Sequence, residues 1–311
     1  MSARNDQMKV ADAVADSWVY RLLPQRLWPY AQLARWERPI GWQLLMWPCW
    51  WSLMLAAHQH PAGWLQLSLY LVLFLAGAFL ARGAGCTFND LVDQDIDDKI
   101  ARTRSRPLPS GRVKRGQAFV FLALQGLGAL VVLLQFNTAT ILLGCLSLVT
   151  VVIYPFMKRI TWWPQFFLGL AFSWGALVGW SSLADGLGWP ALILYAGSIC
   201  WVIGYDTIYA LQDIEDDALV GVKSTARLFG DNARSAVAAL YAAAWLLFAV
   251  ACYLAGVSWV AWVGLLGAAA HMAWQIRTLD LGDPAPNLWL FKSNHYLGLI
   301  LFVGLALSLA I

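Results

Sequence analysis

Long apolar runs with few or no charged side chains recur along the whole chain. Such runs of about 20 residues are long enough to cross the hydrocarbon core of a bilayer as helices. Nine of them can be read from the sequence, at about residues 39–57, 64–89, 117–135, 139–157, 164–184, 190–212, 235–255, 258–276 and 291–311. The pattern therefore predicts an all-α membrane protein with nine transmembrane helices.

Basic residues divide the connectors between these runs into two classes. Of the 21 Lys and Arg residues, 19 lie before the first run or in the connectors after the second, fourth, sixth and eighth runs. Of the other two, Arg82 lies inside the second run, and Lys292 is the second residue of the ninth run. Connectors rich in Lys and Arg remain in the cytoplasm. We therefore expect a cytoplasmic N-terminus, an external C-terminus and a multi-pass protein of the inner (cytoplasmic) membrane of the cell.

Composition agrees with a membrane location and excludes other classes. The chain of 311 residues is 60% hydrophobic and only 13% charged, well below the charged share of a soluble domain. Its net charge of +3 is small, so we expect no nucleic-acid partner. No pattern indicates an obligate protein partner. We expect one polytopic domain over 1–311, with a cytoplasmic segment at 1–37 and the helical bundle at 38–311.

Acidic residues are concentrated in two short segments, at the ends of the second and sixth runs. Ten of the 18 Asp and Glu residues lie there. At 100° per residue, three carboxylates of each segment share one helix face, within arcs of about 60° and about 40°. These residues are Asp90, Asp93 and Asp97 in the first stripe, and Asp206, Asp213 and Asp217 in the second.

Two carboxylate stripes at matching depth suit a hard divalent cation. Mg²⁺ takes oxygen ligands and keeps coordination positions for the phosphate oxygens of a substrate. A single stripe is equally consistent with a solvated helix end. Two stripes, both at the cytoplasmic ends of helices where the helix dipole disfavours anions, favour a Mg²⁺ site for a phosphorylated substrate.

Basic residues near the stripes complete a candidate anion site. Arg82 lies eight residues before Asp90, and an Arg within a membrane needs a partner, so its side chain is expected to face the bundle interior. Lys158 ends the fourth run, and Lys223 follows the second stripe. Each of these lysines, taken singly, also fits the ordinary excess of basic residues in cytoplasmic connectors.

Several motifs resemble those of the UbiA superfamily of intramembrane prenyltransferases. The first stripe reads NDxxDxxxD from Asn89 to Asp97, and a second DxxxD follows from Asp213 to Asp217. Three further stretches resemble the branch that prenylates 4-hydroxybenzoate. They are RPLPSG at 106–111, YPFMKRxTxxPQxxLG at 154–169 and GxKSTA at 221–226.

The resemblance implies nine helices around a central cavity that opens to the cytoplasm and to lipid. It implies transfer of a polyprenyl group from polyprenyl diphosphate to 4-hydroxybenzoate, a step of ubiquinone biosynthesis. Tyr154 and Lys158 match a YxxxK element that contacts the diphosphate, and Arg82 and Lys223 are further diphosphate or structural partners. The Mg²⁺ ligands that it implies are Asn89, Asp90, Asp93, Asp97, Asp213 and Asp217.

Two residues are candidates for handling the aromatic acceptor. Asp206 lies on the second stripe, about 10 Å deeper than Asp213 by helix rise, and could take the ring proton. It could equally be a structural acid. Arg38, at the entry to the first run, has the planar guanidinium that grips a carboxylate in a bidentate manner. An Arg at this position could equally extend to the membrane interface.

Two alternatives remain open at the level of sequence. A related prenyltransferase could use a different acceptor, such as a naphthoate, homogentisate or a porphyrin. A transporter could also place acidic residues within the membrane, although transporters favour a site near the bilayer midplane. The concentration of acidic residues at one membrane face argues against the transporter.

Overall fold

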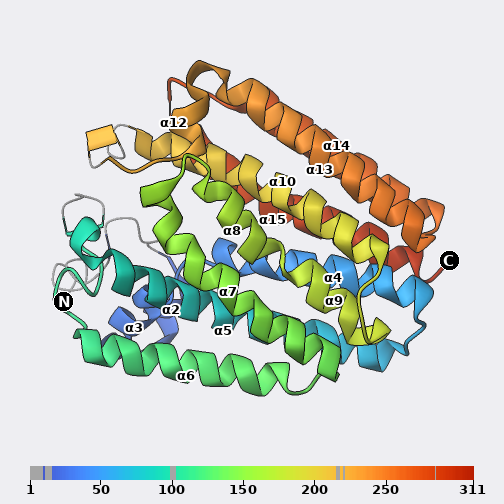
Figure 1. Ribbon diagram of the computed structural model, residues 1–311, viewed down its shortest axis with the longest axis horizontal. Coiled ribbons are helices and arrows are strands. Elements are labelled where there is room, and N and C mark those ends of the chain that lie inside the picture. The colour runs from blue at the N-terminus through green and yellow to red at the C-terminus, as the bar shows by residue number, and fades with distance from the viewer. Residues whose placement is uncertain (1–9, 11–15, 99–102, 215–217, 220, 284) are drawn as a thin grey trace. The chain divides into compact units, whose positions relative to one another are not determined.

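The computed structural model describes residues 10, 16–98, 103–214, 218–219, 221–283 and 285–311 (Figure 1). Every regular element in this part of the chain is a helix, so the all-α prediction is confirmed. The chain forms two compact units. Unit 1 comprises Met1–Gln43 and Leu75–Val132, and unit 2 comprises Leu44–Phe74 and Leu133–Ile311.

Helices occupy all nine predicted positions, and one of the nine is interrupted at Trp174. The long helices are α4 (Ile40–Gln59), α5 (Trp64–Asp97), α6 (Arg115–Leu133), α7 (Thr138–Ile160), α8 (Pro164–Ser173), α9 (Gly175–Ala184), α10 (Trp189–Ala210), α13 (Ala233–Ala255), α14 (Trp259–Thr278) and α15 (Ala285–Ser308). Among the described residues, seven segments have both the length and the hydropathy of a membrane span. The protein is therefore a multi-span membrane protein.

The other two positions, α4 and α14, have the length of a span but lower hydropathy. Each helix has 20 residues, and each contains Trp, Gln and His among its aliphatic side chains. Tryptophan has an apolar ring and one polar N–H group. A helix rich in tryptophan can therefore be buried although its mean hydropathy is low. The protein has nine spans only if these two helices also cross the membrane, so the count of nine stays a prediction.

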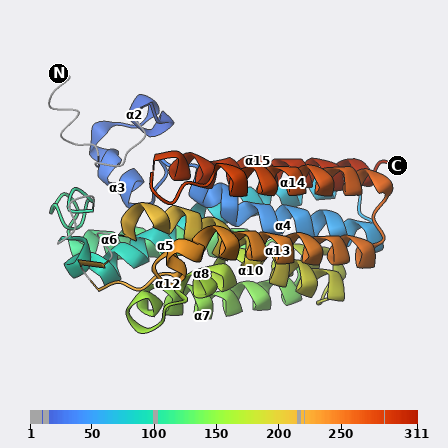
Figure 2. The ribbon, with the colours of Figure 1, turned by 90° about the horizontal axis from the view of Figure 1, so that it is seen from above.

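Helix α10 is the centre of unit 2, where it packs against α8, α9, α13 and α15. Helix α14 packs against α15, as Figure 2 shows, and also contacts α13. The fully buried rings of Trp51, Trp201 and Phe248 form the middle of this packing. The ring centroids of Trp51 and Trp201 are 5.1 Å apart, and those of Trp51 and Phe248 are 5.5 Å apart.

Two buried hydrogen bonds in unit 2 join helices without charge. Trp201 donates from Nε1 to Oδ1 of Asn294 over 2.8 Å, which joins α10 to α15. The hydroxyl of Tyr241 donates to Oε1 of Gln275 over 2.6 Å, which joins α13 to α14. Neutral hydrogen bonds of this kind avoid the large cost of burying an ion.

Helices α4 and α9 approach so closely that only glycine fits at one position. A Cβ atom on Gly179 would lie 2.4 Å from the backbone oxygen of Cys49. Ser52 on α4 also donates a hydrogen bond to the backbone oxygen of Ala176 on α9. The pair of helices therefore depends on backbone-to-backbone contact, which a larger residue at 179 would prevent.

The segment before the first span is folded in unit 1. It contains α2 (Trp18–Leu22), the 3-10 helix η1 (Gln25–Leu27) and α3 (Trp28–Leu33). Leu33 packs with Leu91 of α5 and Leu108 of the following connector. The segment therefore covers part of the surface where α5 ends.

Helix α5 continues beyond the predicted end of its span at residue 89. It has 34 residues, so at 1.5 Å per residue it is about 51 Å long, against a hydrocarbon core of about 30 Å. The part of α5 that qualifies as a membrane span is Trp64–Asp95, and Asp97 lies beyond it. The final turns of α5 carry the first aspartate motif.

Candidate active site

The first aspartate motif forms a buried carboxylate stripe on α5. Asp90, Asp93 and Asp97 are only 1%, 0% and 4% exposed, although they lie in the last turns of a helix. Burying three carboxylates on one helix face is costly unless cations or metal ions compensate for their charge. The alternative that the sequence left open, in which this stripe is an ordinary solvated helix end, is therefore wrong.

Arg106 compensates for part of this charge. Its Nη1 lies 2.7 Å from Oδ2 of Asp97 and 3.5 Å from Oδ1 of Asp90. Arg106 begins the RPLPSG stretch, where Ser110 donates from Oγ to the Arg106 carbonyl over 2.6 Å and Gly111 has a positive φ of 70°. The tight turn of this motif therefore fixes Arg106 beside the stripe.

Arg35, from the segment before the first span, pairs with the same stripe. Its Nη2 lies 2.7 Å from Oδ1 and 2.9 Å from Oδ2 of Asp90. Charge-assisted bonds of this length are the strong ones. Arg106 is one of the basic residues that follow the first stripe and were expected in the anion site, whereas no motif in the sequence marks Arg35.

The side chain of Arg35 is held by its own segment. Its Nη1 donates to the carbonyl of Gln32 over 2.6 Å, and its backbone has a positive φ of 58°. Gln32 in turn contacts two residues from different parts of unit 1. Its Nε2 donates to the hydroxyl of Tyr20 over 3.1 Å, and its Oε1 accepts from Nη1 of Arg112 over 2.8 Å.

Burial affects the protonation of Asp97. Desolvation raises the pKa of this carboxyl above its usual range, although the Arg106 guanidinium pulls it down; the neighbouring Asp90 and Asp93 raise it further. The ionised form of Asp97 is therefore disfavoured in the fold, as expected where like charges share a buried site.

Three other predicted residues lie in unit 1. Arg82 is half-buried against the start of α4, because a Cβ atom on Gly41 would lie 2.7 Å from its Nε. Arg38 lies with its Nε 3.2 Å from Oε1 of the fully buried Glu37. Asn89 is half-buried on α5, beside Asp90 in the chain. The expected inward direction of Arg82 is consistent with its burial.

Unit 2 brings together two of the predicted basic residues. The backbone N–H of Lys223 donates to the carbonyl of Lys158 over 3.1 Å, and its Nζ donates to the carbonyl of Ile160 over 3.0 Å. The ammonium of Lys223 thus lies at the C-terminal end of α7, where a helix favours a cation. Tyr154 lies one turn before Lys158 on the same helix.

Asp206 lies half-buried on α10, and its helix is tied to the segment that carries Lys223. Thr207 and Thr225, at the start of α12 (Thr225–Phe229), share a hydrogen bond of 2.7 Å. Asp213 ends the 3-10 helix η2 (Leu211–Asp213). The side chain of Asp213 and the whole of Asp217 lie outside the described part of the chain.

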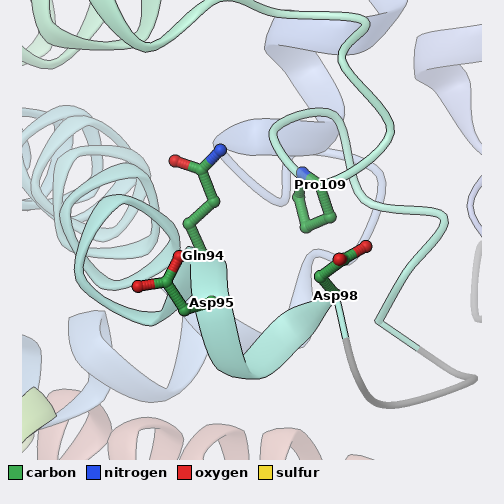
Figure 3. A pocket seen from close by; sticks show the side chains of 4 residues that line it. All are labelled: Gln94, Asp95, Asp98 and Pro109. Carbon is green, nitrogen blue, oxygen red and sulfur yellow. The ribbon is translucent and has the colours of Figure 1, made fainter.

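A surface hollow of about 300 Å³ lies beside the end of α5 and is lined by Gln94, Asp95, Asp98 and Pro109 (Figure 3). Figure 3 shows Gln94 and Asp95 on α5, Asp98 just beyond the end of that helix, and Pro109 on the connector. At 100° per residue, the α5 residues of this hollow lie to one side of the Asp90 stripe. The hollow is therefore distinct from the predicted Mg²⁺ face, and the four described residues that line it include no cation.

The donor chemistry of the α5 stripe fits Mg²⁺. Among the described residues, no group of three or more acidic, His or Cys side chains converges on one point. Mg²⁺ needs less than that, since it is usually held by one or two carboxylates together with substrate phosphates and water. Asp90, Asp93 and Asp97 supply buried carboxylates of this kind.

Comparison with known sequences identifies close relatives. The 4-hydroxybenzoate polyprenyltransferase, mitochondrial, of Arabidopsis thaliana is 45% identical over 307 residues, which cover 98% of this chain and 74% of that protein. The Homo sapiens protein of the same name is 44% identical over 301 residues, covering 96% of this chain and 78% of the human protein.

Solved structures share the fold. The apo structure of a UbiA homolog from Aeropyrum pernix K1 has a TM-score of 0.71 at 26% identity, and the match covers 85% of this chain and 97% of that one. A UbiA homolog from Archaeoglobus fulgidus bound to GPP and Mg²⁺ has a TM-score of 0.66 at 17% identity, with coverages of 91% and 100%.

The family model described as the UbiA prenyltransferase family matches residues 45–303. This match includes both aspartate motifs and most of the long helices. The resemblance predicted from the motifs is confirmed. The chain belongs to the UbiA prenyltransferase family.

Proposed function

We propose that this protein transfers a polyprenyl group from polyprenyl diphosphate to 4-hydroxybenzoate, at the ring carbon ortho to the hydroxyl, as a step of ubiquinone biosynthesis. One observation carries this proposal. A chain that is 45% identical to a 4-hydroxybenzoate polyprenyltransferase buries the carboxylates of its first aspartate motif against the RPLPSG arginine. The branch motif and the aspartate motif thus form one cluster.

In the proposed reaction an allylic cation forms first, and attack by the aromatic ring and loss of a ring proton then neutralise it. The allylic C–O bond breaks, and the diphosphate leaves with the electron pair. The ring carbon beside the phenol hydroxyl attacks the allylic cation, forms the new C–C bond and then loses its proton to a base. Asp206 is the proposed base, because it is a half-buried carboxylate on α10.

Each predicted residue has a proposed role in this reaction. Tyr154, Lys158, Lys223 and Arg82 donate to the diphosphate oxygens as negative charge develops on them. Arg38 grips the carboxylate of 4-hydroxybenzoate. Bound Mg²⁺ would neutralise the leaving diphosphate. Its proposed ligands are Asn89, Asp90, Asp93, Asp97, Asp213 and Asp217.

The proposed location is the inner membrane, with the N-terminus and the opening of the active site on the cytoplasmic side and the C-terminus outside. The side is supported by the 19 basic residues that lie in the N-terminal segment and in connectors on one face. We further propose one polytopic domain over 1–311, around a central cavity. The substrates and the lipid bilayer are its expected partners, with no obligate protein partner.

Competition between acceptors tests the reaction. Purified protein in detergent is incubated with geranyl diphosphate and Mg²⁺, together with 4-hydroxybenzoate, a dihydroxynaphthoate or homogentisate. The products are identified by mass. We expect 3-geranyl-4-hydroxybenzoate, and no product in EDTA. A product from another acceptor alone would refute the proposed acceptor, and no product from any acceptor would refute prenyl transfer.

Charge-neutral variants test the proposed ligands. Asp97→Asn and Asp217→Asn should each lower kcat by about 100-fold or more, since each removes a carboxylate ligand of a metal that stabilises the leaving group. Asp231→Asn is the matched control, because Asp231 is an exposed acid outside both motifs. Full turnover in both motif variants would remove these residues from the metal site.

A further inference from the structure

Arg35 contacts both oxygens of a proposed metal ligand. Its Nη2 lies 2.7 Å and 2.9 Å from the two carboxylate oxygens of Asp90. Asp90 is only 1% exposed, and the Arg35 side chain is 10% exposed. A divalent cation that binds Asp90 must therefore share these oxygens with the guanidinium or displace it.

The charges of the cluster make such sharing unfavourable. Among the described residues, the buried carboxylates Asp90, Asp93 and Asp97 share one face of α5, and the guanidiniums of Arg35 and Arg106 pair with Asp90 and Asp97. The guanidiniums already offset most of the negative charge. Adding a divalent cation alone would place like charges close together in a site with little water to screen them.

A diphosphate would reverse this balance. It brings several negative charges and oxygen acceptors, and a guanidinium binds phosphate as well as it binds carboxylate. Arg35 could then direct its donors to the phosphate and release the oxygens of Asp90. Its backbone is fixed in the left-handed region at φ 58°, a strained state for a residue other than glycine and one that is often found at functional sites.

We propose that Arg35 couples the two ligands of the first aspartate motif. It competes with the divalent cation for Asp90 when no diphosphate is bound, and it binds the diphosphate when that ligand arrives. Arg35 would thereby make tight metal binding depend on the prenyl substrate. The inference rests on the proposed function, because it takes Asp90 as a metal ligand and a diphosphate as the substrate.

The N-terminal segment holds the Arg35 side chain in place for this role. The carbonyl of Gln32 accepts a hydrogen bond of 2.6 Å from its Nη1, and Oε1 of Gln32 is held by Arg112 over 2.8 Å. One edge of the guanidinium is thus anchored to protein, while the other edge contacts Asp90. A short rotation of the side chain would redirect the donors without unfolding the segment.

Metal binding without diphosphate tests the first half of the proposal. Mn²⁺ is titrated into the full chain in detergent, and free Mn²⁺ is followed by electron paramagnetic resonance. Arg35→Gln should bind Mn²⁺ on the order of tenfold more tightly than the unmodified protein, a change within the usual range of coupling between sites. Unchanged or weaker Mn²⁺ binding would overturn the proposal and make Arg35 a structural support.

Diphosphate binding without metal tests the second half. Geranyl S-thiolodiphosphate, which reacts poorly, is titrated in EDTA, so that no metal complex forms in solution. Arg35→Gln should bind this analogue on the order of tenfold more weakly, because a charge-assisted bond to phosphate is lost. Equal affinity would show that Arg35 does not receive the diphosphate and would overturn this part.

Three further variants keep the outcome interpretable. Arg35→Lys keeps the charge but loses the bidentate geometry, so both affinities should lie between those of Arg35→Gln and the unmodified protein. Arg26→Gln is the matched control, because Arg26 is exposed on the same segment. Asp97→Asn should weaken Mn²⁺ binding. Unchanged binding in Asp97→Asn would refute the metal site itself, whereas a failure confined to Arg35→Gln refutes only the coupling.

Discussion

The described parts of unit 1 and unit 2 bury polar groups in different ways. In unit 1, the stripe of Asp90, Asp93 and Asp97 is buried with its charges, and arginines from two other segments pair with it. In unit 2, the central polar contacts are neutral, such as the indole of Trp201 on the amide of Asn294. Both units contain membrane-spanning segments, so the membrane alone does not explain the difference.

The comparison is between the aromatic centre of unit 2 and the carboxylate stripe of unit 1. Neutral hydrogen bonds and aromatic packing stabilise a bundle without the desolvation cost of ions. A buried cluster of ions is a poor source of stability, because desolvation offsets much of the attraction between its members. We propose that the charges retained in the stripe of unit 1 serve the reaction. Variants of each unit should separate the two effects.

The largest loss of stability is expected where α4 and α9 touch in unit 2. A Cβ atom on Gly179 would lie 2.4 Å from the backbone oxygen of Cys49, and backbone cannot move aside cheaply. Gly179→Ala should therefore leave little folded protein, as measured by monodisperse yield in detergent. Gly126→Ala is the control, because a Cβ atom there meets nothing within 4 Å. Normal yield of both variants would contradict the close contact.

The next largest effect is expected in the aromatic centre of unit 2. Phe248 is fully buried against Trp51. Phe248→Ala should lower the free energy of unfolding by about 3–5 kcal/mol, through lost burial and the cavity that remains. Thermal melting should show this loss, while the remaining folded protein keeps its turnover per molecule. If Phe248→Ala melted normally but turned over slowly, Phe248 would serve the reaction and not the stability of the fold.

A smaller effect is expected when Arg35 loses its partner in unit 1. Asp90→Asn leaves the guanidinium facing a neutral amide, which should cost about 2–3 kcal/mol, below the figure for a fully buried pair because Arg35 keeps some exposure. The double variant with Arg35→Gln should recover much of the loss in thermal melting. Additive losses in the double variant would mean that the two side chains do not interact.

The helices were predictable because hydropathy is a local property of the chain. The run at 164–184, for example, is apolar over its whole length and forms α8 and α9. The end of α5 was less predictable. Charges begin at Asp90, so the apolar run stops there, yet the helix continues to Asp97 with its carboxylates buried. Burial of those charges depends on distant arginines that hydropathy does not describe.

The site was predicted in part, for the same physical reason. The spacing of Asp90, Asp93 and Asp97 gave the stripe, because helical periodicity alone places them on one face. The partner Arg35 was missed, since it lies 55 residues before Asp90 in a segment without a motif. The only available signal was its place in an arginine-rich stretch directly before the first span. Lys223 was predicted near the substrate, and its contact with the end of α7 became visible only in the structure.

Asp97 gives the most direct test that the charges of unit 1 serve the reaction. Burial raises the pKa of its carboxyl, so the folded protein binds more protons there than the unfolded chain does. Its contribution to stability is therefore present at low pH and is lost as pH rises through the folded pKa. At neutral pH, Asp97→Asn should remove an unfavourable charge and leave Asp90 and Asp93 to balance the two arginines.

The decisive measurement is melting temperature and turnover on one preparation of Asp97→Asn at neutral pH. Our account predicts a melting temperature equal to or above that of the unmodified protein, together with a loss of Mg²⁺-dependent prenylation of about 100-fold or more. A clear fall in melting temperature with turnover retained would contradict it. That result would mean that the carboxylate stripe stabilises the fold and does not serve the reaction.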